Sequence, residues 1–196
     1  MGCALMEVLT INGYIHSEKH VSYYALTLVT TFLTLALNPF DCFYRKFRLE
    51  LLKSLWLTMI SPFGEVRFKD FFLGDVLCSA VKPLADVAFI TCYFTTDQWK
   101  NLASEAICVP DDITLALITF LPYHFRFWQC VNKWWYTGQW FPHLVNAAKY
   151  LSSIVTIVMN YLLRHSHLSL EYFIGFYIFT TLFAFAWDMT MDWGVF

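Results

Sequence analysis

The chain has 196 residues, of which 58% are hydrophobic and only 14% charged, and its formal net charge is −2. Soluble domains carry roughly 25% charged residues, so this composition indicates a polytopic membrane protein. Only 13 Lys and Arg are spread along the chain, too few to form a useful basic face, which excludes nucleic acid as a partner.

The first third of the chain predicts one membrane span and one surface helix. Residues 1–20 form a polar segment, and residues 21–37 are apolar over about the length of a bilayer. This span stops at Asn38-Pro39, because a residue before proline is biased away from helix. Residues 45–61 are predicted to be an amphipathic helix on an anionic membrane surface. They place apolar pairs at helical spacing beside four basic residues: Arg45, Lys46, Arg48 and Lys53.

Residues 71–94 predict a second span that carries polar side chains. Asp75, Ser79, Lys82 and Asp86 are separated by four, three and four residues, so on one helix they would share a side. Pro83 lies in the middle of the span and is expected to kink it.

Three further apolar segments complete the predicted bundle. They cover residues 113–131, 144–163 and 172–187. The sequence therefore predicts an all-α fold, a bundle of about five transmembrane helices plus one interfacial helix.

The span at 144–163 has a polar face that a membrane helix does not need for insertion. The gaps between its polar residues run three, four, three, four, which aligns them on one side of a helix. An isolated lysine at bilayer depth costs about 2.5–3.5 kcal/mol, so this face should meet water, a counter-ion or a substrate. We call these residues the polar face: Asn146, Lys149, Ser153, Thr156 and Asn160.

Ionisable residues at or near membrane depth must pair or line a hydrated cavity, because unpaired charges are costly there. One interpretation is that they neutralise one another as structural pairs, for example Lys82 with Asp86 one turn away. Aligned polar sides on three helices favour a shared pathway instead. The residues concerned are Asp75, Lys82, Asp86, Arg126, Lys149, Asp188 and Asp192.

The bases of this set suit an oxyanion such as phosphate. Arg126 and Lys149 are positive and donate hydrogen bonds only, and the neutral groups of Asn146, Ser153 and Thr156 can contact the oxygens of the anion. Asp188 and Asp192, one turn apart, could hold the bases in place, carry a proton or bind a cation.

The six cysteines include no CxxC pair, so neither a disulfide framework nor a zinc site is expected. No catalytic residue, metal site or cofactor is indicated.

Three motifs resemble the EXS domain of eukaryotic phosphate exporters. They are Phe-Pro-His-Leu-Val-Asn-Ala-Ala-Lys-Tyr at 141–150, Arg-Phe-Trp-Gln-Cys at 126–130 and Trp-Asp-Met-Thr-Met-Asp-Trp-Gly at 187–194. That family includes the xenotropic and polytropic retrovirus receptor, the plant root-to-shoot phosphate loader and a yeast Golgi phosphate recycler. The resemblance covers residues 21–196 and implies a partial EXS domain.

The resemblance implies a non-enzymatic, channel-like pathway that exports inorganic phosphate or recycles it from an organelle. Asp75, Lys149, Asp188 and Asp192 match pathway positions, and Arg126 lies in a matching motif. Cys78 departs from the family, which often has Asn at that place. The resemblance leaves the membrane undecided between Golgi and plasma membrane.

The SPX domain and the last helices of the family do not appear in this sequence, so we expect a fragment, a truncated gene product or one half of an assembly. A second copy or a longer family member is the expected protein partner. Two alternatives stay open. One is a truncated, non-transporting retention or interaction factor, and the other is an intramembrane phosphotransferase in which Asp188 and Asp192 chelate Mg²⁺.

Overall fold

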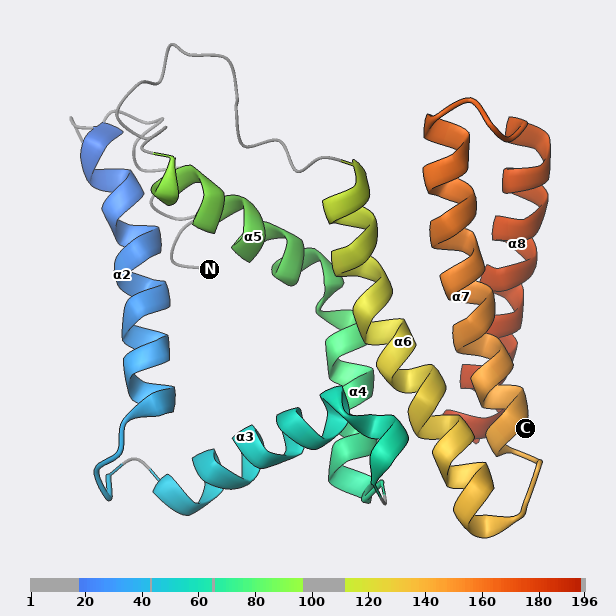
Figure 1. The fold of residues 1–196 in the computed structure, drawn as a ribbon, viewed down its shortest axis with the longest axis horizontal. Coiled ribbons are helices and arrows are strands. Elements are labelled where there is room, and N and C mark those ends of the chain that lie inside the picture. The colour runs from blue at the N-terminus through green and yellow to red at the C-terminus, as the bar shows by residue number, and fades with distance from the viewer. Residues whose placement is uncertain (1–17, 43, 65, 97–111, 195–196) are drawn as a thin grey trace. The chain divides into compact units, whose positions relative to one another are not determined.

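The computed structural model describes residues 18–42, 44–64, 66–96 and 112–194, and every regular element in these ranges is helical (Figure 1). The all-helical prediction is therefore confirmed. The elements are α2 (Glu18–Leu37), α3 (Arg45–Met59), the 3-10 turn η1 (Ser61–Phe63), α4 (Phe68–Ser79), α5 (Val81–Thr95), α6 (Asp112–Thr137), α7 (His143–Arg164), α8 (Leu170–Trp187) and the π-helical turn η3 (Asp188–Asp192).

The predicted second span is two helices. α4 ends before Ala80, and α5 starts at Val81 with a bend of 65° between the helices. The expected kink at Pro83 thus lies one turn earlier, because proline offers no N–H to the carbonyl of Ser79 and its ring crowds that carbonyl. The break corrects the expectation of one continuous polar side over residues 75–86.

The five-span bundle is confirmed only in its helical character. By length and apolar composition, one described stretch can cross a bilayer, Leu170–Asp192, and a second is added if the bent α4–α5 pair counts as one span. α6 and α7 are long enough to cross a bilayer, at 26 and 22 residues, but their polar side chains make them less apolar than a typical membrane-spanning helix. Thr27–Leu37 in α2 is apolar but shorter.

The chain divides into two compact units, which we describe separately. The first comprises residues 1–51 and 86–109. Within it, α2 ends at Leu37 as predicted, and Arg48 on α3 donates to the carbonyls of Leu35, Phe40 and Cys42, the last at 2.8 Å. A cation at the carboxyl end of a helix satisfies carbonyls that have no partner in the helix.

The second unit, residues 52–85 and 110–196, holds the helices that matter most below. α7 packs against α6 on one side and α8 on the other, and α4 packs against α6 (Figure 1). Asn132 of α6 donates to the carbonyls of Ser61 and Gly64, at 3.0 and 2.9 Å, which fastens the η1 region to α6.

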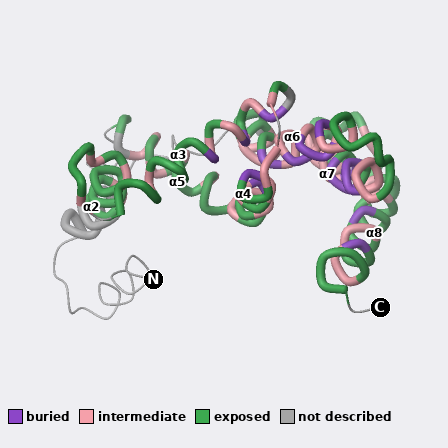
Figure 2. Tube along the Cα trace, turned by 90° about the horizontal axis from the view of Figure 1, so that it is seen from below, coloured by how far each residue is buried: buried purple, intermediate pink, exposed green. Residues whose placement is uncertain are grey.

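The interior of the second unit is unusually polar for a folded protein. Its apolar core is small, with Cys130, Ala147 and Tyr150 at the centre. Buried residues concentrate along α4, α6 and α7 (Figure 2). Most of them are polar: Ser54, Thr58, Ser61, Asp70, Arg126, Gln129, Asn132, Asn146, Lys149, Ser152 and Thr180.

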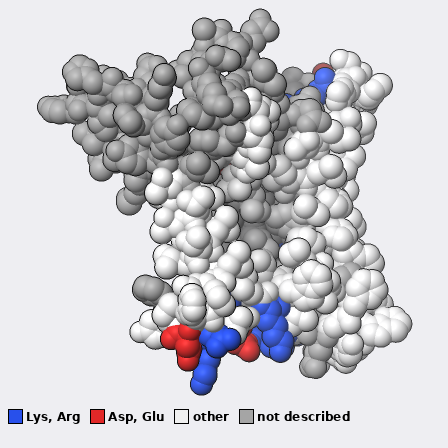
Figure 3. Space-filling view, turned by 60° about the vertical axis from the view of Figure 1, so that its left-hand side comes forward, with Lys and Arg blue, Asp and Glu red and all other residues white. Residues whose placement is uncertain are grey.

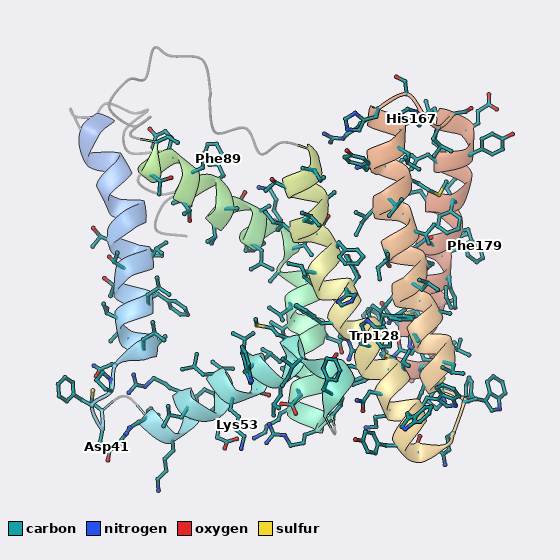
Figure 4. All side chains as sticks on the ribbon, viewed as in Figure 1. Asp41, Lys53, Phe89, Trp128, His167 and Phe179 are labelled. Carbon is teal, nitrogen blue, oxygen red and sulfur yellow. The ribbon has the colours of Figure 1, made fainter. Side chains whose placement is uncertain are left out.

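The outer surface is correspondingly apolar. Charged side chains occupy only small parts of the described surface on the face shown in Figure 3. Phe179 points away from α7 (Figure 4), and its side chain is 58% exposed. Many other large apolar residues of α8 are also exposed. Large apolar side chains outside and polar groups inside are expected of a protein that meets lipid rather than water.

One expectation about cysteine is wrong. Cys92, near the end of α5, is disulfide-bonded, whereas Cys42, Cys78 and Cys130 are free thiols. Spacing along the sequence could not reveal this bond, because a disulfide depends on which residues meet in space.

Candidate functional site

Arg126 is the most deeply buried charged residue of the site, with a side chain only 1% exposed. Its Nε lies 2.8 Å from Oδ1 of Asp75 on α4, and its Nη2 donates to Asp75 Oδ2 at 3.1 Å. The same Nη2 donates to the Tyr150 hydroxyl at 3.0 Å, and that hydroxyl donates to Asp75 Oδ1 at 2.7 Å. α4, α6 and α7 therefore meet at one guanidinium.

The remaining sides of this guanidinium are also occupied. The Phe71 ring lies 3.7 Å from the guanidinium carbon, a cation–π distance. Nη1 donates to Oε1 of Gln129 at 2.9 Å. The close approach of α6 to α4 depends on Gly74, because a Cβ there would lie 2.4 Å from Cδ of Arg126.

Lys149 forms the second centre of charge. Its side chain is only 8% exposed, and its Nζ lies 2.9 Å from Asp188 Oδ1 and 3.6 Å from Asp192 Oδ2. Both carboxylates belong to the π-helical turn after α8. π-helical turns are rare and occur frequently at functional sites.

Tyr150 joins the two centres. Its hydroxyl contacts Arg126 and Asp75, while its ring lies 4.9 Å from Nζ of Lys149. We call the joined residues the charged cluster: Asp75, Arg126, Lys149, Tyr150, Asp188 and Asp192. Asp75, Asp188 and Asp192 have side chains 49%, 44% and 52% exposed, so the acids face outward and the bases lie behind them.

The polar face of α7 extends from this cluster. Asn146, one turn before Lys149, is buried. The Ser153 hydroxyl donates to the Lys149 carbonyl at 3.3 Å, and the Thr156 hydroxyl donates to the Thr180 hydroxyl on α8 at 3.2 Å.

The far end of the polar face opens into a cavity of about 400 Å³ formed by α6, α7, α8 and the start of α5. Asn160 lies eleven positions after Lys149, which corresponds to about 16 Å along a helix. The cavity provides hydroxyl, amide and guanidinium groups from Thr119, Thr156, Asn160, Tyr161, Arg164 and Tyr177.

Three predicted site residues lie apart from these contacts. Ser79 is exposed, and its hydroxyl donates a hydrogen bond to the backbone carbonyl of Asp75 at 3.3 Å. Lys82 and Asp86 are exposed on α5, and Asp86 belongs to the other compact unit, so the structure does not place it against the cluster.

Three residues of the site were not predicted from the sequence: Tyr150, Gln129 and Gly74. Tyr150 follows Lys149 directly and falls outside the three-and-four spacing that defines the polar face. Gln129 lies three residues after Arg126, a spacing that lets two side chains meet on a helix and could have marked the pair. Gly74 offered no signal, since its role depends on a contact with another helix.

The geometry allows an anion to compete for buried cations. Two bases face three carboxylates, so the cluster has one excess negative charge when all five groups are ionised. An oxyanion could contact Lys149 by replacing its looser partner, Asp192. Asp188 and Asp192 both have a carboxylate oxygen within ion-pair distance of Lys149.

The family model and the similar proteins indicate the same family for this chain. The family model described as EXS family matches residues 1–196. The xenotropic and polytropic retrovirus receptor 1 homolog of Danio rerio is 33% identical over 186 residues, covering 87% of this chain and 27% of that protein. Solute carrier family 53 member 1 of Homo sapiens is 32% identical over 191 residues, covering 88% of this chain and 27% of that protein.

Phosphate transporter PHO1 of Arabidopsis thaliana is 30% identical over 195 residues, covering 96% of this chain and 24% of that protein. The chain thus spans about a quarter of the length of these relatives. They are named as transporters and receptors, not as enzymes.

Proposed function

The chain belongs to the EXS family, and from that premise we propose that it forms part of a pathway for inorganic phosphate along the polar face of α7. EXS-family transporters are integral membrane proteins. The proposed direction is export from the cytosol or recycling from an organelle, as the family resemblance implies.

The observation that supports the proposal most strongly is the environment of Lys149. A buried ammonium group with two half-exposed carboxylates is poorly explained as a packing device, because an apolar side chain would fill the space at no electrostatic cost. It is well explained as an anion site whose cation is held by carboxylates until phosphate arrives.

In the proposed step, phosphate takes the place of Asp192 at Lys149. Asp188 keeps its 2.9 Å contact, so the lysine stays oriented while the anion binds. The polar face then leads the anion toward the cavity at Thr156 and Asn160, where further neutral and basic groups contact its oxygens.

The proposal includes the membrane arrangement expected from the sequence. The helical segments near residues 21–37, 71–94, 113–131, 144–163 and 172–187 cross the bilayer, and α3 lies in its interface. The polar character of α6 and α7 supports this arrangement, because the polar sides of these helices contact each other rather than lipid.

The direct test is phosphate flux across vesicles that contain this protein. Lys149→Ala removes the cation that binds the anion, and Asp192→Ala removes the carboxylate that must return to Lys149 to release it, so each should lower flux at least tenfold. Matched controls are Lys46→Ala and Asp41→Ala, which remove exposed charges outside the cluster and should keep wild-type flux. Wild-type flux in both cluster variants would refute the proposal.

The two alternatives make different predictions. A retention or interaction factor would co-purify with a longer family member and show no flux of its own. A Mg²⁺-dependent phosphotransferase would turn over a phosphate-containing substrate. The pairing of Asp188 and Asp192 with Lys149 favours the transport reading over the metal enzyme.

A further inference from the structure

Gln129 connects the charged cluster to the rest of the second unit. Its side chain is completely buried, and its two polar atoms serve different partners. Oε1 accepts from Nη1 of Arg126 at 2.9 Å, and Nε2 donates to the backbone carbonyl of Asp70 at 2.9 Å. We infer that Gln129 is a positioning residue that fixes the guanidinium plane of Arg126 and thereby orients Asp75 and Tyr150.

The orientation of a guanidinium follows from contacts on its edges and its faces. Asp75 contacts both Nε and Nη2 of Arg126, Tyr150 contacts Nη2, and Phe71 covers one face. Gln129 is the partner of Nη1. Without this acceptor a buried N–H of a charged group loses its hydrogen bond, and the Nη1 edge of the guanidinium is no longer fixed against α6.

Gln129 can direct Arg126 only because it is itself held in place. Asp70, whose carbonyl it contacts, forms a salt bridge with Arg67 at 2.9 Å. The Asp70 carboxylate also accepts from Ser54 of α3, and Thr58 of α3 donates to the Asp70 carbonyl at 3.2 Å. A continuous chain of hydrogen bonds thus runs from α3 through the start of α4 to Arg126.

This inference rests on the proposed phosphate pathway for its functional part, because Arg126 matters to transport only if the charged cluster does. Gln129 does not need to touch phosphate. It acts through Arg126, which contacts the half-exposed Asp75 and the hydroxyl of Tyr150, and the ring of Tyr150 lies beside Lys149.

The test separates geometry from transport. Gln129→Met keeps the length of the side chain and removes both hydrogen bonds. In ¹⁵N-arginine-labelled protein in lipid nanodiscs, the Arg126 Nη signals of the wild type should show restricted rotation, and the variant should show faster exchange between its Nη groups. The chain has five arginines, and loss of a signal in Arg126→Lys assigns the correct one.

Flux measurements on the same variants complete the test. Gln129→Met should lower phosphate flux about tenfold. The exposed Gln139 provides a matched control, and Gln139→Met should change neither the NMR signals nor the flux. If Gln129→Met fails to fold, Gln129→Asn, whose amide cannot reach both partners, should change both readouts in the same direction.

Unchanged Arg126 signals in Gln129→Met would overturn the inference regardless of flux. A second outcome is faster exchange of the Arg126 Nη groups in Gln129→Met with wild-type flux, while Lys149→Ala loses flux. This outcome would overturn the role of Gln129 in transport and leave the proposed pathway intact. Wild-type flux in Lys149→Ala and Asp192→Ala would instead overturn the pathway, while the NMR result would still decide whether Gln129 positions Arg126.

Discussion

Gly74 shows how strongly one missing methyl group can shape a charged site. At this position on α4, a Cβ would lie 2.4 Å from Arg126 Cδ and 2.6 Å from Gln129 Oε1. Both neighbours are buried and hydrogen-bonded to each other, so moving either one away would disturb that hydrogen bond.

We therefore expect Gly74→Ala to destabilise the protein by about 1–3 kcal/mol, as overpacking of a tight interior does. Thermal unfolding of the purified protein in detergent measures the effect. Gly175→Ala is the control, because a Cβ at Gly175 in α8 meets nothing within 4 Å. A wild-type midpoint for Gly74→Ala would show that α4 and α6 are not held this closely.

The two partners of Lys149 should differ in their contributions to folding. Asp188 lies 2.9 Å from Nζ, whereas Asp192 lies 3.6 Å away. Chemical unfolding of the purified protein should therefore show that Asp188→Asn lowers the free energy of unfolding by about 1 kcal/mol more than Asp192→Asn does. The opposite order would mean that Asp192 is the principal counter-ion and would remove the basis for its exchange with phosphate.

Among the elements, α3 has its polar and apolar sides reversed relative to a helix of a soluble protein. It buries Ser54 and Thr58 against Asp70 and exposes Leu52, Trp56 and other large apolar side chains. Such a helix fits a place in the membrane interface, where its outer side meets lipid and its basic residues meet headgroups.

A spin label at Trp56→Cys in vesicles should show high collision rates with oxygen, which is concentrated in lipid, and low rates with a water-soluble nickel reagent. A label at the exposed Lys46→Cys should show the reverse. Equal exposure of both labels to the nickel reagent would place α3 in water and contradict its interfacial assignment.

Sequence periodicity located the helices well because it depends on neighbours along the chain. The end of α2 at Leu37 and the alignment of Lys149 with Thr156 follow from local spacing. The kink expected from Pro83 is present, and it lies at Ala80 because proline acts on a carbonyl four residues earlier.

Contacts between helices were harder to predict. Asp188 and Asp192 were considered as groups that could hold the bases, and both lie at Lys149. The role of Tyr150 as a bridge and that of Gln129 at Arg126 depend on how α4, α6 and α7 pack. A single sequence does not encode that packing as a visible period.

At the scale of the whole molecule, the distribution of polarity is the property that supports membrane transport. The described interior contains more polar than apolar residues, and many large apolar residues are exposed. In water this arrangement would be unstable, whereas in a bilayer it places polar groups where an ion can meet them. The chain spans only about a quarter of the length of its relatives.

The most direct test of the pathway is the reactivity of single cysteines along α7 toward a charged, membrane-impermeant thiol reagent. Ser153→Cys and Asn160→Cys lie on the polar face, whereas Val158→Cys lies on an exposed apolar side. Relative to the unsubstituted protein, the first two should react quickly, and phosphate, but not chloride, should slow them. Val158→Cys should not react. Equal reactivity at all three positions, or no protection by phosphate, would contradict a phosphate pathway along the polar face of α7.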